Sequence, residues 1–282
     1  MPNNNSSLTP VVKWVGGKRQ LLSDIVELLP KELLEEKLMY YEPFIGGGAL
    51  FFHLKPSKAI INDNNSELIN LYKVIKQNPS ELIEDLKRHK NEENYFYEIR
   101  AIDRDEIAYS KLSDVEKASR LLYLNKTCYN GLYRVNSLGQ FNTPFGKYNK
   151  PNIVNEKLIN EIHNYLSISD IKITNKDFEM SLNNIEADSF VYFDPPYDPL
   201  SSSSNFTAYT KDGFSKQEQI RLRDLCIRLD RMGVKFLISN SDTDFICELY
   251  SCFNITKTFA SRAVNSKAAG RGTVSEVLVT NY

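Results

Sequence analysis

The residues with the clearest capacity for chemistry follow an apolar strand that starts near Phe190 and ends in Asp194-Pro195-Pro196-Tyr197. The two prolines fix φ and stiffen the turn, at the carboxyl end of a strand where open α/β sheets bind ligands. Asp194 and the carbonyl of Pro195 can then accept both hydrogens of an exocyclic amino group, while Tyr197 offers a ring face for stacking. Drawing these hydrogens out of the plane of an adenine would localise the lone pair of N6 and make that nitrogen nucleophilic towards a sulfonium methyl. A purely structural turn with an exposed Asp194 is the alternative.

A glycine-rich turn after an earlier strand predicts a nucleoside pocket. That strand is expected to end at Glu42, and residues 43–48 (PFIGGG) precede an apolar helix. Such a turn lets a ligand approach bare backbone near a helix N-terminus. Twenty-one residues after Glu42, the next strand ends at Asp63, whose carboxylate can accept hydrogen bonds from both hydroxyls of a ribose. The spacing favours an adenosine-containing cofactor, although a plain tight turn explains the glycines alone. Phe51 stands where a nicotinamide fingerprint has its third glycine, which disfavours that cofactor.

The segment Lys13-Trp14-Val15-Gly16-Gly17-Lys18 is a third candidate for ligand binding. It is not a phosphate loop of the Walker type, because Val12 replaces the first glycine and Arg19 replaces the Ser or Thr. An indole, two lysines and pliable backbone beside the sheet suit contacts with an adenosine and with a cofactor carboxylate. A helix entry with a packed Trp14 is the alternative.

Length and composition limit the class of protein. The 282 residues allow one large domain or two modest ones, and the contents of 41% hydrophobic and 25% charged residues are those of a globular protein. No run approaches the ~18 apolar residues of a membrane span, and residues 1–10 lack the apolar core of a signal peptide. We therefore expect a cytoplasmic protein without a membrane partner. Four cysteines without CxxC spacing and three scattered histidines predict neither disulfides nor a metal site.

Charge is distributed unevenly, although the net charge is only −1. Residues 117–155 contain six Lys and Arg and no acid, and residues 249–275 contain four Lys and Arg and no acid, whereas residues 77–107 contain nine acids and five bases. Aromatic side chains interleave with the first basic set: Tyr123, Tyr129, Tyr133, Phe141, Phe145 and Tyr148. Rings beside cations suit base stacking next to a phosphate track, so this segment favours nucleic-acid binding over two merely solvated basic loops.

Apolar periodicity predicts the elements that position these residues. Helical patterns at 18–29, 66–76 and 215–232 alternate with expected strands at 39–41, 59–61, 170–174, 190–193, 235–239, 253–258 and 274–280. Strand alternating with helix predicts an α/β fold, a doubly wound and mostly parallel seven-stranded sheet. The alternation fails between about residues 79 and 148, where helices at 81–88, 95–103 and 113–124 precede a Gly- and Asn-rich loop or hairpin. That region is interpreted as an insertion.

In these motifs the chain resembles the Dam-type family of DNA adenine-N6 methyltransferases, in the same order and over nearly the whole length. The resemblance implies a Rossmann-like methyltransferase sheet, comprising residues 1–65 and 156–282, with an inserted, mainly helical target-recognition domain at 66–155. It implies S-adenosylmethionine as the cofactor and Asp194, Pro195, Pro196 and Tyr197 as the catalytic residues. The implied cofactor-binding residues are Trp14, Gly17, Lys18, Glu42, Phe44, Gly46, Gly48, Asp63, Asp177, Phe178 and Asp194.

The insertion resembles the family's GATC-reading hairpin. This resemblance implies that Arg134 pairs with a guanine edge, Leu132 and Pro144 contact the thymine methyl, and Lys13 reaches the outer guanine. Tyr129 would wedge into the duplex. The segment 206–209 resembles the second DNA-facing hairpin, and residues 256–271 a phosphate-contacting loop. The full set of implied DNA-binding residues is Lys13, Tyr129, Asn130, Leu132, Arg134, Asn136 and Pro144.

The resulting hypothesis is transfer of a methyl group from S-adenosylmethionine to adenine N6 in duplex DNA, in GATC, by base flipping and without a metal. A cytosine-C5 enzyme needs a Pro-Cys pair, which the sequence lacks, and cytosine-N4 enzymes usually have Ser where Asp194 stands. An RNA or protein-amide methyltransferase and a non-catalytic DNA-binding module remain alternatives. A monomer is expected, with a cognate restriction endonuclease, if there is one, acting separately.

Overall fold

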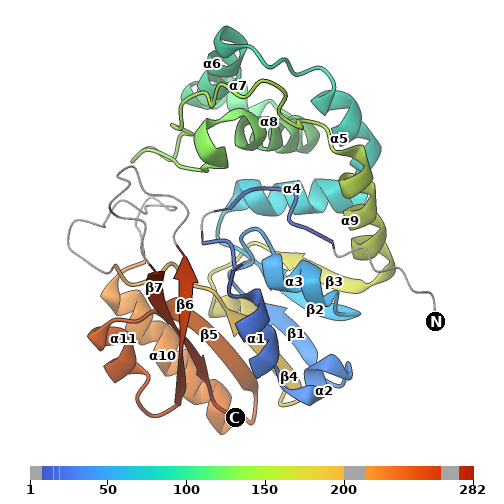
Figure 1. Ribbon diagram of the computed structural model, residues 1–282. Helices are drawn as coiled ribbons and strands as arrows, with labels where there is room; N and C mark the ends of the chain where they lie inside the picture. Colours follow the sequence, from blue (N-terminus) through green and yellow to red (C-terminus); the bar gives the residue numbers. More distant parts are fainter. Residues whose placement is uncertain (1–7, 15, 19, 200–213, 262–272) are drawn as a thin grey trace.

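The computed structural model describes residues 8–14, 16–18, 20–199, 214–261 and 273–282 (Figure 1). The expected DNA-facing segment 206–209 and most of the expected phosphate-contacting loop lie outside these residues. Within them, seven strands form one sheet in the order β3-β2-β1-β4-β5-β7-β6. The strands are β1 (Met39–Glu42), β2 (Lys58–Asn62), β3 (Asp170–Thr174), β4 (Ser189–Phe193), β5 (Lys235–Ser241), β6 (Asn254–Ser261) and β7 (Thr273–Thr280).

The sheet is mixed, which corrects the expectation of a mostly parallel sheet. β3, β2, β1, β4 and β5 pair in parallel, but β7 runs antiparallel to both β5 and β6. Registers such as Ile238 opposite Val279 and Lys257 opposite Val277 define these antiparallel pairs. The parallel expectation rested on strand–helix alternation, and antiparallel neighbours need no crossover helix between them. The reversed direction of β7 therefore could not be predicted from that pattern.

Helices cover the sheet on both faces. Side chains of Tyr192 and Leu237 belong to a core that includes residues of α1, α3 and α4, whereas Val191 and Phe236 belong to a second core that includes residues of α10 and α11. Because successive strand residues point to opposite faces, the two cores lie on opposite sides of the sheet. The helices are α1 (Leu22–Leu28), α2 (Lys31–Leu34), α3 (Ala49–Leu54), α4 (Ser66–Gln77), α9 (Glu156–Ile168), α10 (Lys216–Arg231) and α11 (Asp244–Leu249).

The region between α4 and α9 is helical, as the sequence predicts. Its elements are α5 (Pro79–Leu86), α6 (Glu93–Ala101), η1 (Ile102–Arg104), α7 (Glu106–Ser110), α8 (Asp114–Thr127) and η2 (Tyr129–Gly131). Ser113 and Glu116 form a capping box that starts α8, because each side chain bonds the other's backbone N–H. In Figure 1, α4 lies between the sheet and α5 to α8. Leu121 and Leu124 of α8 share the first core with Leu71 of α4, so the helical region is packed directly onto the α/β part.

A loop of irregular structure follows α8. Isolated bridges pair Cys128 with Phe145 and Val135 with Phe141, which folds this loop into a hairpin-like arrangement. The bridges agree with the predicted loop or hairpin. Among the helices that the structure describes, none combines the length and the apolar character needed to cross a bilayer.

Candidate active site

The Asp-Pro-Pro-Tyr turn follows the carboxyl end of β4, a strand whose five residues are all buried. Asp194 Oδ1 accepts a hydrogen bond from Ser239 Oγ of β5 at 3.1 Å and lies 2.6 Å from Lys18 Nζ. Burial raises the pKa of Asp194, while the charge of Lys18 and the hydrogen bonds from Lys18 and Ser239 lower it. A carboxylate in this position is a fixed acceptor with one cation already bound to it.

Lys18 connects the N-terminal segment with this turn. Its side chain is buried, its ammonium donates to Gly16 O at 2.6 Å, and the same nitrogen lies 4.5 Å from the centre of the Tyr197 ring. A donating nitrogen thus sits between the Asp194 carboxylate and the Tyr197 ring face. These are two of the groups that the sequence assigns to the target base, whereas the sequence places Lys18 with the cofactor.

Tyr197 is anchored at its other end. Its hydroxyl donates to Glu276 Oε2 of β7 at 2.8 Å, and burial raises its pKa well above the ordinary value, with Asp194 and Glu276 adding to the shift. The Tyr197 ring is therefore held from both sides, by Glu276 at its hydroxyl and by Lys18 over its face. Sequence reasoning missed Glu276, which lies 79 residues from Tyr197 and in no motif.

The residues of the predicted nucleoside pocket lie close together around Asp63. Its Oδ2 accepts the backbone N–H of Gly46 at 3.0 Å and its Oδ1 accepts that of Asn65 at 2.9 Å, and burial raises the pKa of Asp63 to about 6. Gly46 and Gly48 have positive φ of 46° and 72°. A Cβ on Gly46 would lie 3.0 Å from the indole of Trp14, so only glycine fits without a shift. Bare backbone, an indole and a carboxylate thus converge here, as an adenosine-containing cofactor requires.

Glu42 adds a second buried carboxyl group at the end of β1. The hydroxyl of Tyr40 donates to its Oε2 at 2.5 Å. Burial raises the pKa of Glu42 well above the ordinary value, and Asp194 and Asp63 raise it further while Lys18 lowers it. Because β1 lies between β2 and β4 in the sheet, Glu42, Asp63 and Asp194 lie at or just beyond the carboxyl ends of three neighbouring parallel strands.

The predicted adenine-flanking residues lie beside the second core. Phe178 stacks on Phe44 with ring centres 5.3 Å apart, and the Arg221 guanidinium lies 4.4 Å from the Phe178 ring centre. Asp177 is ion-paired with the same Arg221. Phe44 and Phe178 are thereby brought together, whereas the Asp177 carboxylate is engaged by a side chain that sequence reasoning did not anticipate. Their contact with the cofactor stays a prediction.

Asn125 joins the N-terminal segment to the DNA-facing loop. It accepts the backbone N–H of Lys13 at 2.9 Å and donates to the carbonyls of Lys13 and Gly131 at 2.8 and 3.1 Å. Next to it, Trp14 stacks on Tyr133 with ring centres 4.7 Å apart. The cofactor-side residue Trp14 is therefore packed against the loop that carries the predicted DNA contacts. Asn125 is buried and had no sequence signal, because its partners are set by tertiary structure.

Most predicted DNA contacts are available at the surface of the loop. Lys13, Tyr129, Asn130, Arg134 and Pro144 are exposed, Tyr129 to 56%, and Leu132 is half-buried. The remaining predicted contact, the Asn136 side chain, is used inside the loop. Its Oδ1 accepts the backbone N–H groups of the residues at positions 138 and 140, and its Nδ2 donates to the side chain at position 140.

Arg134 has a partner that the sequence did not reveal. Its Nε donates to Asn142 Oδ1 at 2.7 Å, and the backbone N–H of Asn142 donates to the Arg134 carbonyl at 2.9 Å. The guanidinium is thus anchored at Nε on an exposed loop. This leaves the two terminal nitrogens as the edge available for a base.

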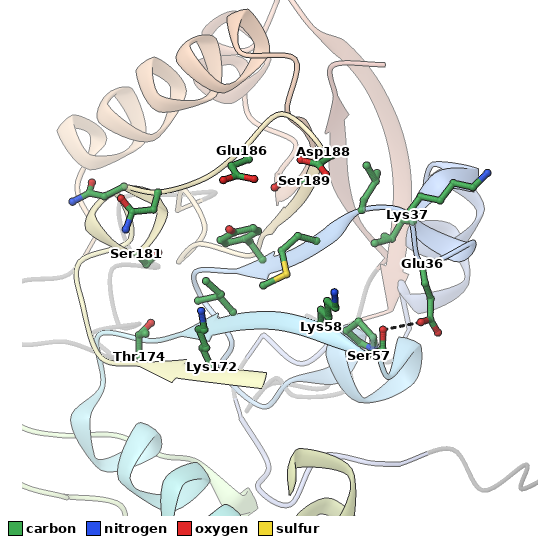
Figure 2. A pocket seen from close by; sticks show the side chains of 18 of the residues that line it. Glu36, Lys37, Ser57, Lys58, Lys172, Thr174, Ser181, Glu186, Asp188 and Ser189 are labelled. Carbon is green, nitrogen blue, oxygen red and sulfur yellow. Dashed lines mark hydrogen bonds between the residues drawn. The ribbon is translucent and has the colours of Figure 1, made fainter. Parts of the chain in front are cut away.

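A separate hollow of about 750 Å³ lies over one face of β1, β2 and β3 (Figure 2). Lys58 and Lys172 line it from β2 and β3, and Glu186 and Asp188 line it from the segment before β4. That segment forms only the short 3-10 turn η3 (Met180–Leu182), which leaves this face of the sheet open. Among the described residues, those that line the hollow include none of the predicted site residues. The predicted site residues therefore lie at the carboxyl ends of the strands and not in this hollow.

An α/β sheet with a nucleoside-type pocket after β1 and an Asp-Pro-Pro-Tyr turn after β4 defines an S-adenosylmethionine-dependent amino-methyltransferase. Residues 14–264 match the family model of the D12 class N6 adenine-specific DNA methyltransferases, and the chain belongs to this family. The predicted family, enzyme class and cofactor are confirmed.

Curated relatives extend over nearly the whole chain. The type II methyltransferase M1.LlaDCHI of Lactococcus lactis subsp. cremoris is 49% identical, over 100% of this chain and 98% of its own. The type II methyltransferase M.MjaIII of Methanocaldococcus jannaschii is 42% identical, over 97% and 99%. The DNA adenine methylase of Escherichia coli K12 is 35% identical, over 95% and 93%. The similarity therefore includes both the sheet and the helical region.

Proposed function

We propose that this enzyme methylates adenine N6 in duplex DNA within GATC, by flipping the target base out of the duplex and transferring the methyl group directly. The observation that carries the proposal is the position of Lys18 Nζ. A hydrogen-bond-donating nitrogen lies 2.6 Å from the Asp194 carboxylate and over the ring of Tyr197. A flipped adenine can contact the same two groups once Lys18 has moved, its amine donating to Asp194 and its ring stacking on Tyr197.

In this proposal the chain acts by orientation and electrostatics. Asp194 and the carbonyl of Pro195 accept the N6 hydrogens, and Tyr197 stacks on the purine. In the cofactor-free enzyme burial raises the pKa of Asp194, and Lys18 and the Ser239 hydroxyl oppose this shift and so favour the ionised, accepting form. When bound, S-adenosylmethionine supplies an electrophilic methyl group on a sulfonium sulfur. The nucleophile is N6 itself, so no side chain has to form a covalent intermediate. The new bond from N6 to the methyl carbon would replace the bond from that carbon to sulfur, the sulfur would leave as a neutral thioether, and N6 would release one of its two protons.

The residues that would hold the cofactor fit its chemistry. Asp63 has two oxygens facing backbone amides and can accept from ribose hydroxyls, and the bare backbone at Gly46 lies under the Trp14 indole. Lys18 would exchange the Asp194 carboxylate for the carboxylate of the cofactor's amino-acid part. This exchange would free Asp194 for the target base.

The proposed target-recognition part comprises residues 66–155, and the catalytic part comprises residues 1–65 and 156–282. Support comes from the six Lys and Arg without an acid at 117–155 and from the exposed Tyr129 and Arg134. In this proposal Arg134 reads a guanine through its two terminal nitrogens, which match O6 and N7. The likeness of this loop to a GATC-reading hairpin supports GATC as the site. Flipping costs a few kcal/mol of lost stacking and pairing, about what a wedge such as Tyr129 would offset.

We further propose that the enzyme works as a cytoplasmic monomer and that any restriction endonuclease that cuts the same site acts separately. The type II names of the Lactococcus and Methanocaldococcus relatives support a role in restriction–modification. The described part of one chain already brings together cofactor-type, catalytic and DNA-facing residues, which supports action as a monomer.

The test uses cofactor labelled in its methyl group and four substrates. These are a GATC duplex, a duplex with one base of the site changed, a GATC duplex already methylated at N6, and an RNA of the same sequence. Label in the first substrate alone, recovered as N6-methyladenine, is the expected result. Label in RNA alone would make the enzyme an RNA methyltransferase, equal label in the altered duplex would reject GATC, and no label in any substrate would favour a non-catalytic binding protein.

A further inference from the structure

Two buried amide side chains, Gln219 of α10 and Asn240 of β5, hold the main chain on both sides of Tyr197. Gln219 Nε2 donates to the carbonyl of Pro196 at 2.9 Å. Asn240 Nδ2 donates to Gln219 Oε1 at 3.1 Å, and Asn240 Oδ1 accepts the backbone N–H of Asp198 at 3.1 Å. The peptide group before Tyr197 and the one after it are thus joined through this amide pair.

Both amide side chains are buried, where a polar group without a hydrogen-bond partner destabilises the fold. Gln219 is 1% exposed and Asn240 is fully buried. Buried amides of this kind are stabilised only by the hydrogen bonds they make, so their geometry is strongly restricted. Asn240 Oδ1 is further held by the backbone N–H of Ser241 at 2.8 Å. The turn is therefore attached to the rigid strand β5 and not merely packed against it.

Strand β5 holds the turn at two points. Ser239 donates to the Asp194 carboxylate, and its neighbour Asn240, whose side chain points to the other face of the sheet, accepts from the backbone of Asp198. The two contacts lie on either side of the Pro-Pro pair. They fix the distance and angle between the carboxylate of Asp194 and the ring of Tyr197, which are the two groups proposed to hold the target base.

We propose that Gln219 and Asn240 are positioning residues for methyl transfer, a role that rests on the proposed function. They touch no reacting atom but hold Tyr197 and the Pro195-Pro196 backbone in the geometry that the transfer requires. A displacement of about 1 Å at a reacting centre can lower a rate by about 10²-fold, so loss of these hydrogen bonds should reduce the chemical step more than it reduces cofactor binding.

The first test compares the variant Gln219→Leu with wild type and with Gln217→Leu, a matched control at an exposed position of the same helix. Single-turnover methyl transfer, the cofactor dissociation constant and the thermal unfolding midpoint are measured for each. We expect Gln219→Leu to transfer at least about tenfold more slowly, with cofactor affinity unchanged, and Gln217→Leu to match wild type. A wild-type transfer rate in folded Gln219→Leu would overturn the proposal.

A second variant, Gln219→Glu, distinguishes positioning from a general packing role. It keeps the shape and the oxygen that accepts from Asn240, but only the protonated carboxyl can donate to the Pro196 carbonyl. Its transfer rate relative to wild type should therefore rise as the pH falls, since burial raises the pKa of a carboxyl group. Among the described residues, the titratable groups near this turn include Asp194, Lys18, Tyr192, Glu276 and Asp198, and they are common to both proteins.

The pH series decides the matter if Gln219→Leu does not fold. A rate ratio of Gln219→Glu to wild type that rises at low pH supports the role, and a ratio that is constant with pH overturns it. Asp194→Ala, measured in the same assay, separates this inference from the function on which it rests. Full activity of Asp194→Ala would reject the proposed mechanism, whereas an inactive Asp194→Ala beside a fully active Gln219→Leu would reject only the positioning role.

Discussion

The hydrogen bond between Arg134 and Asn142 predicts how sharply the enzyme reads one guanine. Arg134 Nε donates to Asn142 Oδ1 at 2.7 Å, so the guanidinium is anchored before DNA arrives and its two terminal nitrogens form the free edge. This edge matches the O6 and N7 acceptors of guanine in the major groove. Asn142→Ala removes the anchor without removing the cation, and Arg134→Ala removes the reading group itself.

The magnitudes of the two effects differ. A bidentate Arg–guanine contact is worth about 1–3 kcal/mol of discrimination, so Arg134→Ala should lower the preference for guanine by about 5- to 160-fold. Asn142→Ala leaves the contact possible but requires the freed side chain to be ordered on binding, which costs about 0.5–1.5 kcal/mol. Because Arg134 is exposed, water can replace the lost hydrogen bond, and we expect about a 2- to 12-fold loss of preference.

The assay measures kcat/KM for the cognate duplex and for a duplex with the Arg134-contacted guanine changed, in both single variants and in the double variant. Asn142 acts only through Arg134, so Asn142→Ala should have no further effect on preference in the Arg134→Ala background. Independent, additive effects of the two substitutions, or an unchanged preference in Asn142→Ala alone, would refute the reasoning.

Three further outcomes follow from the site. Burial raises the pKa of Asp63 to about 6. Because only the ionised carboxylate accepts hydrogen bonds from both ribose hydroxyls, cofactor affinity should fall as the pH drops through about 6. Calorimetric titration of the cofactor into wild type and Asp63→Asn should show this pH dependence in wild type only. In the cofactor-free enzyme Lys18 lowers the pKa of Asp194, so Lys18→Met should move the acidic limb of kcat/KM to higher pH, and an unmoved limb would contradict this role. Asn125→Ala leaves three backbone groups of residues 13 and 131 without their hydrogen-bond partner. It should reduce the free energy of unfolding, measured by denaturant titration, by about 1–3 kcal/mol. A change near zero would contradict the role of Asn125 in joining the N-terminal segment to the loop.

Local pattern was sufficient for much of the fold and for the main site motifs. The ends of three strands could be located because each apolar run is followed by a charged residue: β1 ends at Glu42, and Asp63 and Asp194 directly follow β2 and β4. The parallel strands bring these ends to one edge of the sheet. Gly46 was predictable because a close approach of backbone and ligand needs a residue without a side chain. These features depend on neighbours in the chain.

The partners of these residues depend on tertiary structure, and sequence pattern does not contain them. Glu276, Asn125 and Asn142 were missed, since the contacts of the first two join segments 79 and 112 residues apart and Asn142 lies in an irregular loop. Ser239 and its neighbour Asn240 carried a usable signal, because two polar residues follow the apolar start of β5 at its carboxyl end. The strand β7 was predicted, but its antiparallel direction was missed, because the alternation of strands and helices does not indicate strand direction where that alternation ends.

The most direct test of the central claim, that Asp194 holds the target amine for methyl transfer, is the single-turnover rate of Asp194→Ala together with its cofactor affinity. We predict that the variant still binds the cofactor through the Asp63 and Trp14 side of the pocket, while transfer to adenine falls by about 10²-fold or more. A variant that binds cofactor and methylates the duplex at the wild-type rate would contradict the claim.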